Sequence, residues 1–294
     1  MDRYKIIKWP NGLLWLEFEA KNVEEGLLIA KEKLIDNFIC DFHPTDNITD
    51  LSFLNSTIVK GLNVTFSGLK SNAELNEFNN LRILLSLFGK PVTLLDFSKL
   101  TKIEELEITY NNKVDGLSKL VNLRELRLWK YMPRTKDLVE FRGYSKVKKI
   151  LLVQPVIESL DGIQELHQLN TLEIVKPKGL KYFFKTTHKK YLENIERLSF
   201  SFCKDFDFES MPVLKNVNSF SIADNGTIKT LETILQKIPN LKLLFFTRTE
   251  LLDGNLDYLL DHPTLEKVAI DHKKLYNKKE KEINAILTEK RNKK

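Results

Sequence analysis

The chain has 294 residues, of which 42% are hydrophobic and 29% are charged, with a formal net charge of +6. This composition is typical of a folded protein, and the length suits one elongated repeat domain or two globular domains. No run of residues approaches the roughly 18 consecutive apolar residues of a membrane span. Residues 272–294 contain nine Lys or Arg and three Glu, so they carry the whole net charge, and a basic binding face elsewhere is not predicted.

Residues 1–48 are predicted to form an N-terminal cap, a β-hairpin followed by a helix. Residues 4–9 and 13–19 are strand-like, and Pro10-Asn11-Gly12 between them has the chemistry of a tight turn. The sequence after residue 22 has apolar residues at helical spacing that continue as far as Ile39. Such a cap would shield the open end of a stack of repeats.

A short apolar phrase recurs over residues 49–272. Its first residue is followed by further apolar residues three and five positions on, as in Ile103, Leu106 and Ile108, and Ser86 is the clear exception. Each phrase predicts one short strand whose alternate side chains point into a shared core. Ten phrases occur, 20 to 26 residues apart, and their first residues are Val59, Leu81, Ile103, Leu123, Val147, Leu169, Ile195, Val217, Leu241 and Leu265.

The spacing L-x-x-L-x-L-x-x-N and its period resemble the leucine-rich repeat, in particular the twenty-two-residue, internalin-like class and its stand-alone intracellular bacterial members. The resemblance implies an α/β leucine-rich-repeat solenoid, a curved right-handed stack with a parallel β-sheet on its concave face and short helices or 3₁₀ turns on its convex side. The ninth position, usually Asn in the family, is Asn only at Asn111 and Asn225, so an irregular solenoid is expected. A longer convex helix is expected between Leu169 and Ile195.

Residues 273–294 are predicted to form a C-terminal helical cap that ends in a basic tail. The alternative is an electrostatic arm for an acidic partner, a nucleic acid or a membrane surface. The helix, over residues 274–290, would bury a narrow apolar stripe made of Leu275, Ile283, Ile286 and Leu287.

Catalytic chemistry is not predicted. The sequence contains no nucleotide-binding, hydrolase or zinc-protease motif and no Cys/His cluster at metal-ligand spacing, so no enzyme activity, cofactor or metal is expected. Cys40 and Cys203 lie in apolar segments and are expected to be buried and reduced. Because no secretory signal is recognised at the N-terminus, the expected location is cytoplasmic.

The repeat register predicts a binding surface instead. Side chains two, four and six positions after each start point away from the core, and in the family this concave face is where partners commonly bind. Ile83, Leu85 and Leu87 would form an apolar patch there, or would be buried if the register slips by one residue. Aromatic, apolar and charged side chains gather in the predicted partner-binding set: Glu105, Glu107, Tyr110, Glu125, Arg127, Trp129, Tyr131, Lys149, Leu151, Val153, Glu173 and Phe245.

The function predicted from these features is that of a non-enzymatic scaffold that binds a folded protein partner on the concave face. By analogy with related bacterial proteins, a narrower version is an inhibitor or immunity protein that covers a toxin or enzyme. The alternative is a binder of nucleic acid or an anionic surface that acts through the basic tail. Nucleic acid is not favoured, because basic and aromatic residues do not alternate on the repeat face. A monomer is expected, with self-assembly through the concave face as the alternative.

Overall fold

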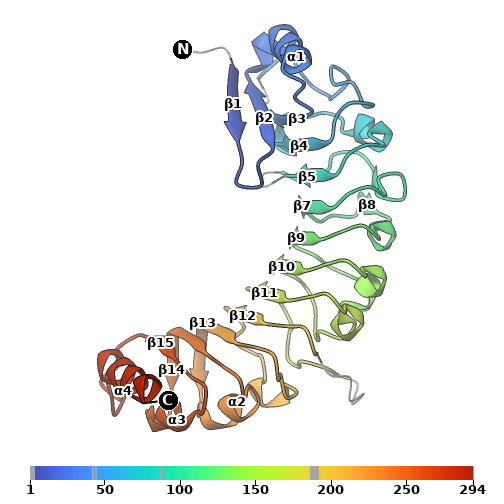
Figure 1. Cartoon of the computed structure of the whole chain (residues 1–294). Coiled ribbons are helices and arrows are strands. Elements are labelled where there is room, and N and C mark those ends of the chain that lie inside the picture. Colours follow the sequence, from blue (N-terminus) through green and yellow to red (C-terminus); the bar gives the residue numbers. More distant parts are fainter. Residues whose placement is uncertain (1–3, 42, 44, 87–88, 186–191, 294) are drawn as a thin grey trace. The chain divides into compact units, whose positions relative to one another are not determined.

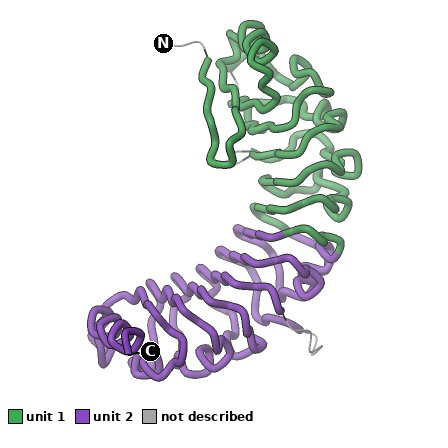
Figure 2. The backbone as a smooth tube through the Cα atoms, viewed as in Figure 1, with its two compact units in different colours: residues 1–131, 143–147 green, residues 132–142, 148–294 purple. Residues whose placement is uncertain are grey.

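The computed structural model of the chain describes residues 4–41, 43, 45–86, 89–185 and 192–293. The chain divides into two compact units (Figure 2). Unit 1 comprises residues 1–131 and 143–147, and unit 2 comprises residues 132–142 and 148–294. Within each unit, short parallel strands follow one another along one side, and turns and short helices make up the other side (Figure 1).

The strands of unit 1 form a sheet in the order β1-β2-β3-β4-β5-β7-β9. The pair β1–β2 is an antiparallel hairpin, and the pairs after it are parallel. A separate parallel pair, β6–β8, lies among the turns. The bounds are β1 (Tyr4–Lys8), β2 (Leu14–Phe18), β3 (Asn37–Cys40), β4 (Gly61–Val64), β5 (Ile83–Leu85), β6 (Leu95–Asp96), β7 (Glu105–Thr109), β8 (Val114–Asp115) and β9 (Glu125–Trp129).

The expected N-terminal hairpin and helix are present, but the helix is shorter than the apolar spacing predicted. Helix α1 (Val23–Glu32) is followed by Leu34, whose φ of 54° places it in the left-handed region and ends the helical path. Residues 37–40 then form strand β3, which pairs in parallel with β2 and β4. Phe38 is therefore a buried core residue of the sheet and not part of a helix face.

The strands of unit 2 are all parallel and run in the order β10-β11-β12-β13-β14-β15. They are β10 (Lys149–Val153), β11 (Thr171–Val175), β12 (Arg197–Ser201), β13 (Ser219–Ile228), β14 (Leu243–Leu251) and β15 (Lys267–Ile270). The helices of this unit are α2 (Glu232–Gln236), α3 (Asp257–Asp261) and α4 (Glu280–Asn292).

Several of the remaining turns contain 3₁₀ helices, as expected for the side opposite the sheet. The longer helix expected between Leu169 and Ile195 falls partly on residues 186–191, which lie outside the described residues. The described parts of that interval contain no helix. The 3₁₀ helices span Ala20–Asn22, Phe66–Gly68, Ala73–Glu77, Leu117–Lys119, Val139–Gly143, Ile163–Glu165 and Phe208–Ser210.

The predicted repeat register is confirmed by burial. Side chains three and five positions after each start are buried in both units, as for Leu106 and Ile108 in β7 and for Leu172 and Ile174 in β11. Ser86, the lapse in the pattern, still occupies a buried position. Because side chains alternate along a strand, the residues between these positions project from the opposite face of the sheet.

The last strand of unit 2 is covered by α4, which confirms the C-terminal helical cap. The Asn284 amide donates to the Val268 carbonyl and accepts from the Val268 N–H, at 2.9 Å in each case. The Glu280 carboxylate accepts from the Ile270 N–H at 3.0 Å. These side chains form hydrogen bonds with backbone N–H and C=O groups that would otherwise be unpaired on an edge strand.

The apolar stripe of this helix is confirmed in part. Ile283 and Leu287 are buried, and Ile286 is half-buried. Leu275 is 52% exposed, so its predicted place on the stripe is wrong. It precedes the first residue of α4 and does not share the helical spacing that the sequence suggested.

Candidate functional site

The strand face of unit 1 is the non-core face of β5, β7 and β9. These strands pair in register, so their outward side chains lie in rows across the sheet. Most of the predicted binding residues of this unit are thereby brought together on β7 and β9. One row is Ile83, Glu105 and Glu125, and the next is Leu85, Glu107 and Arg127.

Arg127 lies at the centre of this group. Its guanidinium bonds the Glu107 carboxylate at 3.2 Å and the Glu125 carboxylate at 2.7 Å. Glu107 is only 8% exposed, so it holds Arg127 in place and is not the open rim charge predicted from the sequence. Among the described residues, the Glu105 carboxylate has no hydrogen-bond or ion-pair partner.

The two carboxylates of β7 are poorly solvated. Burial raises the pKa of Glu105 above its ordinary value, the negative charge of Glu125 raises it further, and Arg127 partly opposes these effects. Burial also raises the pKa of Glu107, and the Arg127 charge and hydrogen bond oppose that rise. The ionised form of Glu105 is therefore less stable than in water, and an added positive charge beside it would be favourable.

The aromatic residues around β9 do not all reach the surface. Trp129, at the end of β9, is partly exposed beside Thr109. Tyr110 is also partly exposed and packs edge-on against Tyr131, with ring centroids 5.4 Å apart. Tyr131 is fully buried, so its predicted contact with a partner is wrong. Although it follows β9 by only two residues, its ring is enclosed in the core.

The apolar patch predicted from Ile83 and Leu85 is not exposed, although the register that predicted it is correct. Both side chains are 6% exposed and pack against the fully buried Trp15 of β2. Trp9 stacks on Trp15 with ring centroids 4.4 Å apart. The N-terminal hairpin therefore covers this part of the strand face. Leu87, the third residue of the predicted patch, lies outside the described residues.

Unit 2 carries the other predicted residues on its own strand face. Lys149 and Glu173 form an ion pair at 3.2 Å on adjacent strands. Leu151 and Val153 are partly exposed on β10, and Phe245 is 43% exposed on β14. The predicted binding residues are thus divided between the two units.

Comparison with known proteins agrees with this architecture. No protein-family model matches the sequence, and no curated protein matches it. The similar solved structures include an internalin (InlF) of Listeria monocytogenes, with a TM-score of 0.53 at 16% identity, covering 81% of this chain and 70% of that chain. The fold is that of a leucine-rich-repeat protein.

Two further leucine-rich-repeat structures are similar at lower scores. The functional domain of InlJ from Listeria monocytogenes matches with a TM-score of 0.46 and 15% identity, over 81% of this chain and 51% of that one. A leucine-rich-repeat protein of Leptospira interrogans matches with a TM-score of 0.43 and 16% identity, over 89% of this chain and 90% of that one. At these identities the likeness concerns the fold.

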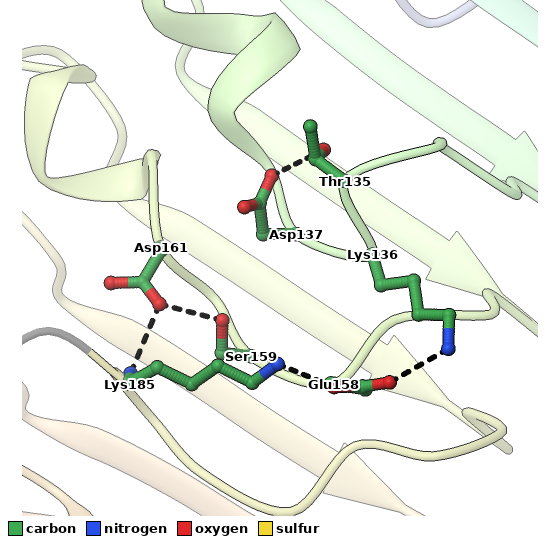
Figure 3. Close-up of polar contacts among 7 residues, drawn as sticks. All are labelled: Thr135, Lys136, Asp137, Glu158, Ser159, Asp161 and Lys185. Carbon is green, nitrogen blue, oxygen red and sulfur yellow. Dashed lines mark hydrogen bonds and ion pairs between the residues drawn. The ribbon is translucent and has the colours of Figure 1, made fainter.

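The turns of the leucine-rich repeats in unit 2 hold a separate polar cluster (Figure 3). Glu158 binds the ammonium groups of Lys136, at 2.9 Å, and of Lys185, and so joins turns from three parts of the chain. Nearby, the buried Asp161 accepts from the Ser159 hydroxyl at 2.6 Å and from the Lys185 backbone N–H at 3.0 Å. The acids in this cluster are held by neighbouring donors, which is the arrangement expected of a structural clip.

The clip should make stability depend on pH. Hydrogen bonds from Lys185 and Lys136, together with their charges, lower the pKa of Glu158 from 4.5 to about 2, so its folded-state pKa lies below its unfolded-state value. The stabilisation is therefore complete above about pH 4.5 and is lost as the pH falls towards about 2. We expect Glu158→Gln to destabilise the protein above about pH 5, and we expect the difference from wild type to disappear near about pH 2 in urea unfolding curves.

The control for this experiment is Glu289→Gln, which removes an exposed carboxylate on α4. Its effect should not follow the pH profile of Glu158→Gln. An effect of Glu158→Gln that stays constant across the acidic range would contradict the clip.

A basic groove lies at the C-terminal end of unit 2, beside α3 and α4. It has a volume of about 640 Å³. Some of its charges are already engaged, because Lys290 donates to the Leu260 carbonyl and Lys242 pairs with Glu266 at 3.4 Å. The lining includes the basic side chains Lys242, Lys290, Arg291 and Lys293 and the apolar residues Leu260, Pro263, Leu265 and Leu287.

Recurring asparagines that were not predicted from the sequence lie among the turns that lead into the strands of each unit. Each directly precedes the first residue of a phrase, and its side-chain amide donates to a backbone carbonyl 21 to 27 residues earlier. The signal was present in the sequence, because Asn recurs at this one position. These asparagines are Asn80 and Asn122 in unit 1 and Asn194, Asn216 and Asn240 in unit 2.

The described residues offer no metal site and no reactive thiol. They contain no group of three or more His, Cys, Asp or Glu placed to hold a metal ion. None of their helices is both long enough and apolar enough to cross a membrane. Cys40 and Cys203 are free and buried, and burial raises the pKa of both thiols, so neither is a reactive thiolate.

Proposed function

We propose that this leucine-rich-repeat protein is a non-enzymatic scaffold that binds a protein partner, and that the strand face of unit 1 is its principal contact surface. The observation that supports this most strongly is Trp129, a partly exposed tryptophan beside an ordered Arg127–Glu107–Glu125 network. Tryptophan and arginine held in place by neighbouring side chains are typical anchors of protein interfaces, because little side-chain freedom is lost on binding.

The outward residues of unit 2 form a second proposed contact surface. Leu151 and Val153 supply apolar area, Phe245 supplies an exposed aromatic ring, and the Lys149–Glu173 pair supplies charge. We propose that the scaffold acts by covering its partner. We therefore propose the role of an inhibitor or immunity protein in a reducing, cytoplasmic compartment of a bacterium, with one chain as the active form.

The test is affinity capture of partners by the wild-type protein and by Trp129→Ala, followed by titration of each captured protein. Loss of a buried tryptophan contact typically costs about 2 kcal/mol or more, so binding should weaken by at least about 30-fold. Tyr182→Ala is the matched control, because Tyr182 is 44% exposed among the turns and outside both strand faces. Equal affinities for the wild type and for Trp129→Ala would contradict the proposal.

A second candidate function is supported by the basic groove beside α4. Arg291 and Lys293 are exposed, and among the described residues neither side chain has an ion-pair partner, so the groove could bind an anionic partner. Deletion of the tail would be a poor test, because Ile283 and Leu287 of the same helix are buried. The better variant replaces Arg291 and Lys293 with Gln, and unchanged salt-dependent binding to a nucleic acid would exclude this function.

A further inference from the structure

The aromatic and acidic side chains on the strand face of unit 1 limit the kinds of partner that this face can bind. Strands β5, β7 and β9 are adjacent, and with a strand spacing of about 4.8 Å they span roughly 10 Å. The covered side, at β5, carries the stacked Trp9 and Trp15. The other side, at the end of β9, carries Trp129. The carboxylates of Glu105 and Glu125 lie opposite each other on β7 and β9, two rows along the strands from Trp129, which lies opposite Thr109.

The charge on this surface is not balanced. It contains the carboxylates of Glu105, Glu107 and Glu125 but one guanidinium, Arg127. The ion pairs of Arg127 go to Glu107 and Glu125. Glu105 is half-buried between the apolar Ile83 and the acidic Glu125, and within the described part of the chain no cation is bonded to it.

The position of Glu105 is unfavourable in the free protein. Its neighbours remove water from one side and place a like charge on the other, and both effects disfavour its ionised form. A cation brought to this point would relieve both effects at once. A metal ion does not fit the donor set, since the described residues include no group suited to hold one. A lysine or arginine side chain fits better, because it carries its charge at the end of an apolar stem, which suits the half-buried surroundings of Glu105 beside Ile83.

We infer that the strand face of unit 1 binds an extended protein segment that carries a lysine or arginine, with the cationic group on Glu105 and neighbouring apolar side chains against Trp129 and Trp9. This inference rests on the proposed scaffold function and specifies the chemistry of its partner. Charge complementarity selects a basic segment, and the aromatic groups at both sides select one in which the cation has apolar neighbours.

The test is a selection from a display library of random peptides about 12 residues long, followed by affinity measurements on the enriched sequences. Peptides that bind the wild type but not Trp129→Ala should share a lysine or arginine. For these peptides, Glu105→Gln should weaken binding at least about tenfold, because a charge-assisted contact in a partly desolvated site is lost. Replacing the shared cation of the peptide with glutamine should not add to the effect of Glu105→Gln.

The matched control is Glu104→Gln. Glu104 directly precedes β7 but pairs with Arg82 at 3.5 Å and Arg124 at 3.3 Å. This variant should bind the same peptides within about twofold of wild type. Equal losses for Glu104→Gln and Glu105→Gln would overturn the inference, because they would show a general charge effect.

Two other outcomes would also overturn it. If the peptides require Trp129 for binding but share no lysine or arginine, the inferred preference for a basic segment is wrong, and the scaffold function is not contradicted. If the library gives no peptide whose binding requires Trp129, the inference that this face binds an extended segment is wrong. The scaffold proposal itself would fall only if captured proteins also bound Trp129→Ala as tightly as wild type.

Discussion

Replacing Trp15 with alanine is expected to lower the free energy of unfolding by roughly 3–5 kcal/mol. Trp15 is fully buried and is the residue through which the hairpin packs against Ile83 and Leu85. It lies so close to β4 that a Cβ at Gly61 would be 2.9 Å from its ring. Alanine would leave a large cavity and would expose apolar side chains of β5, and urea unfolding measures the loss.

Trp15→Phe is the informative companion to this variant. The indole N–H of Trp15 is buried, and within the described part of the chain it has no hydrogen-bond partner. Phenylalanine removes that unsatisfied donor, which offsets about 1–3 kcal/mol of the lost packing. We expect it to cost less than half of the alanine effect. Leu28→Ala, at a side chain that is 68% exposed, is the surface control, and an alanine effect at Trp15 as small as this control would contradict the packing role of the hairpin.

Replacing Asn225 with alanine is expected to cost roughly 2–5 kcal/mol in urea unfolding, because buried backbone groups would lose their partners. Asn225 is 3% exposed. Its amide donates to the Phe200 carbonyl at 2.9 Å, and its side-chain oxygen accepts from the Cys203 N–H. No water can replace these bonds without opening the core of unit 2.

Asn240→Ala, measured in the same way, tests whether the loss of stability in Asn225→Ala depends on the burial of the hydrogen bonds. Asn240 makes a similar bond, to the Lys215 carbonyl at 2.8 Å, but it is exposed. Water can take over that bond, so the expected cost is below about 1 kcal/mol. Equal costs for Asn225→Ala and Asn240→Ala would show that the buried amide has no special role.

The positions of the strands, and which of their side chains point into the core, were predictable from the sequence because both depend on local spacing. An apolar residue three and five positions after each start must face the core, so Leu106 and Ile108 set the orientation of Glu105 and Glu107 as well. The same logic predicted a correct orientation for Ile83 even though a core position of that phrase, Ser86, is polar. The repeat period and the alternation of side chains depend on residues that are close in the sequence, so they can be predicted without knowing the contacts between distant segments.

The features that were missed depend on contacts between distant segments. Ile83 and Leu85 are covered by Trp15, which lies about seventy residues earlier, and no local pattern predicts where a hairpin packs. Tyr131 is fully buried and packs against Tyr110 of the preceding repeat, and the spacing of the apolar residues does not predict this contact. Strand β3 was mistaken for helix because its short apolar run fits both periods, and pairing with β2 and β4 decides between them.

The candidate site was predicted as a set of residues but not as a network. The register placed Glu105, Glu107, Glu125 and Arg127 on one face, and the strand pairing agrees. It could not show that Arg127 is shared by Glu107 and Glu125, or that Glu105 remains without a bonded cation among the described residues. Those facts depend on side-chain conformation and burial, and they support the proposal for a basic partner.

Carboxylate footprinting of the free protein and of its complex with a captured partner would locate the binding face. Chemical amidation read by mass spectrometry should show reduced labelling of Glu105 and Glu125 in the complex, because the partner covers the strand face of unit 1. Labelling of Glu289, which is exposed on α4, should stay unchanged. Equal labelling of Glu105 and Glu125 in the free and bound protein would contradict the proposal that this face binds the partner.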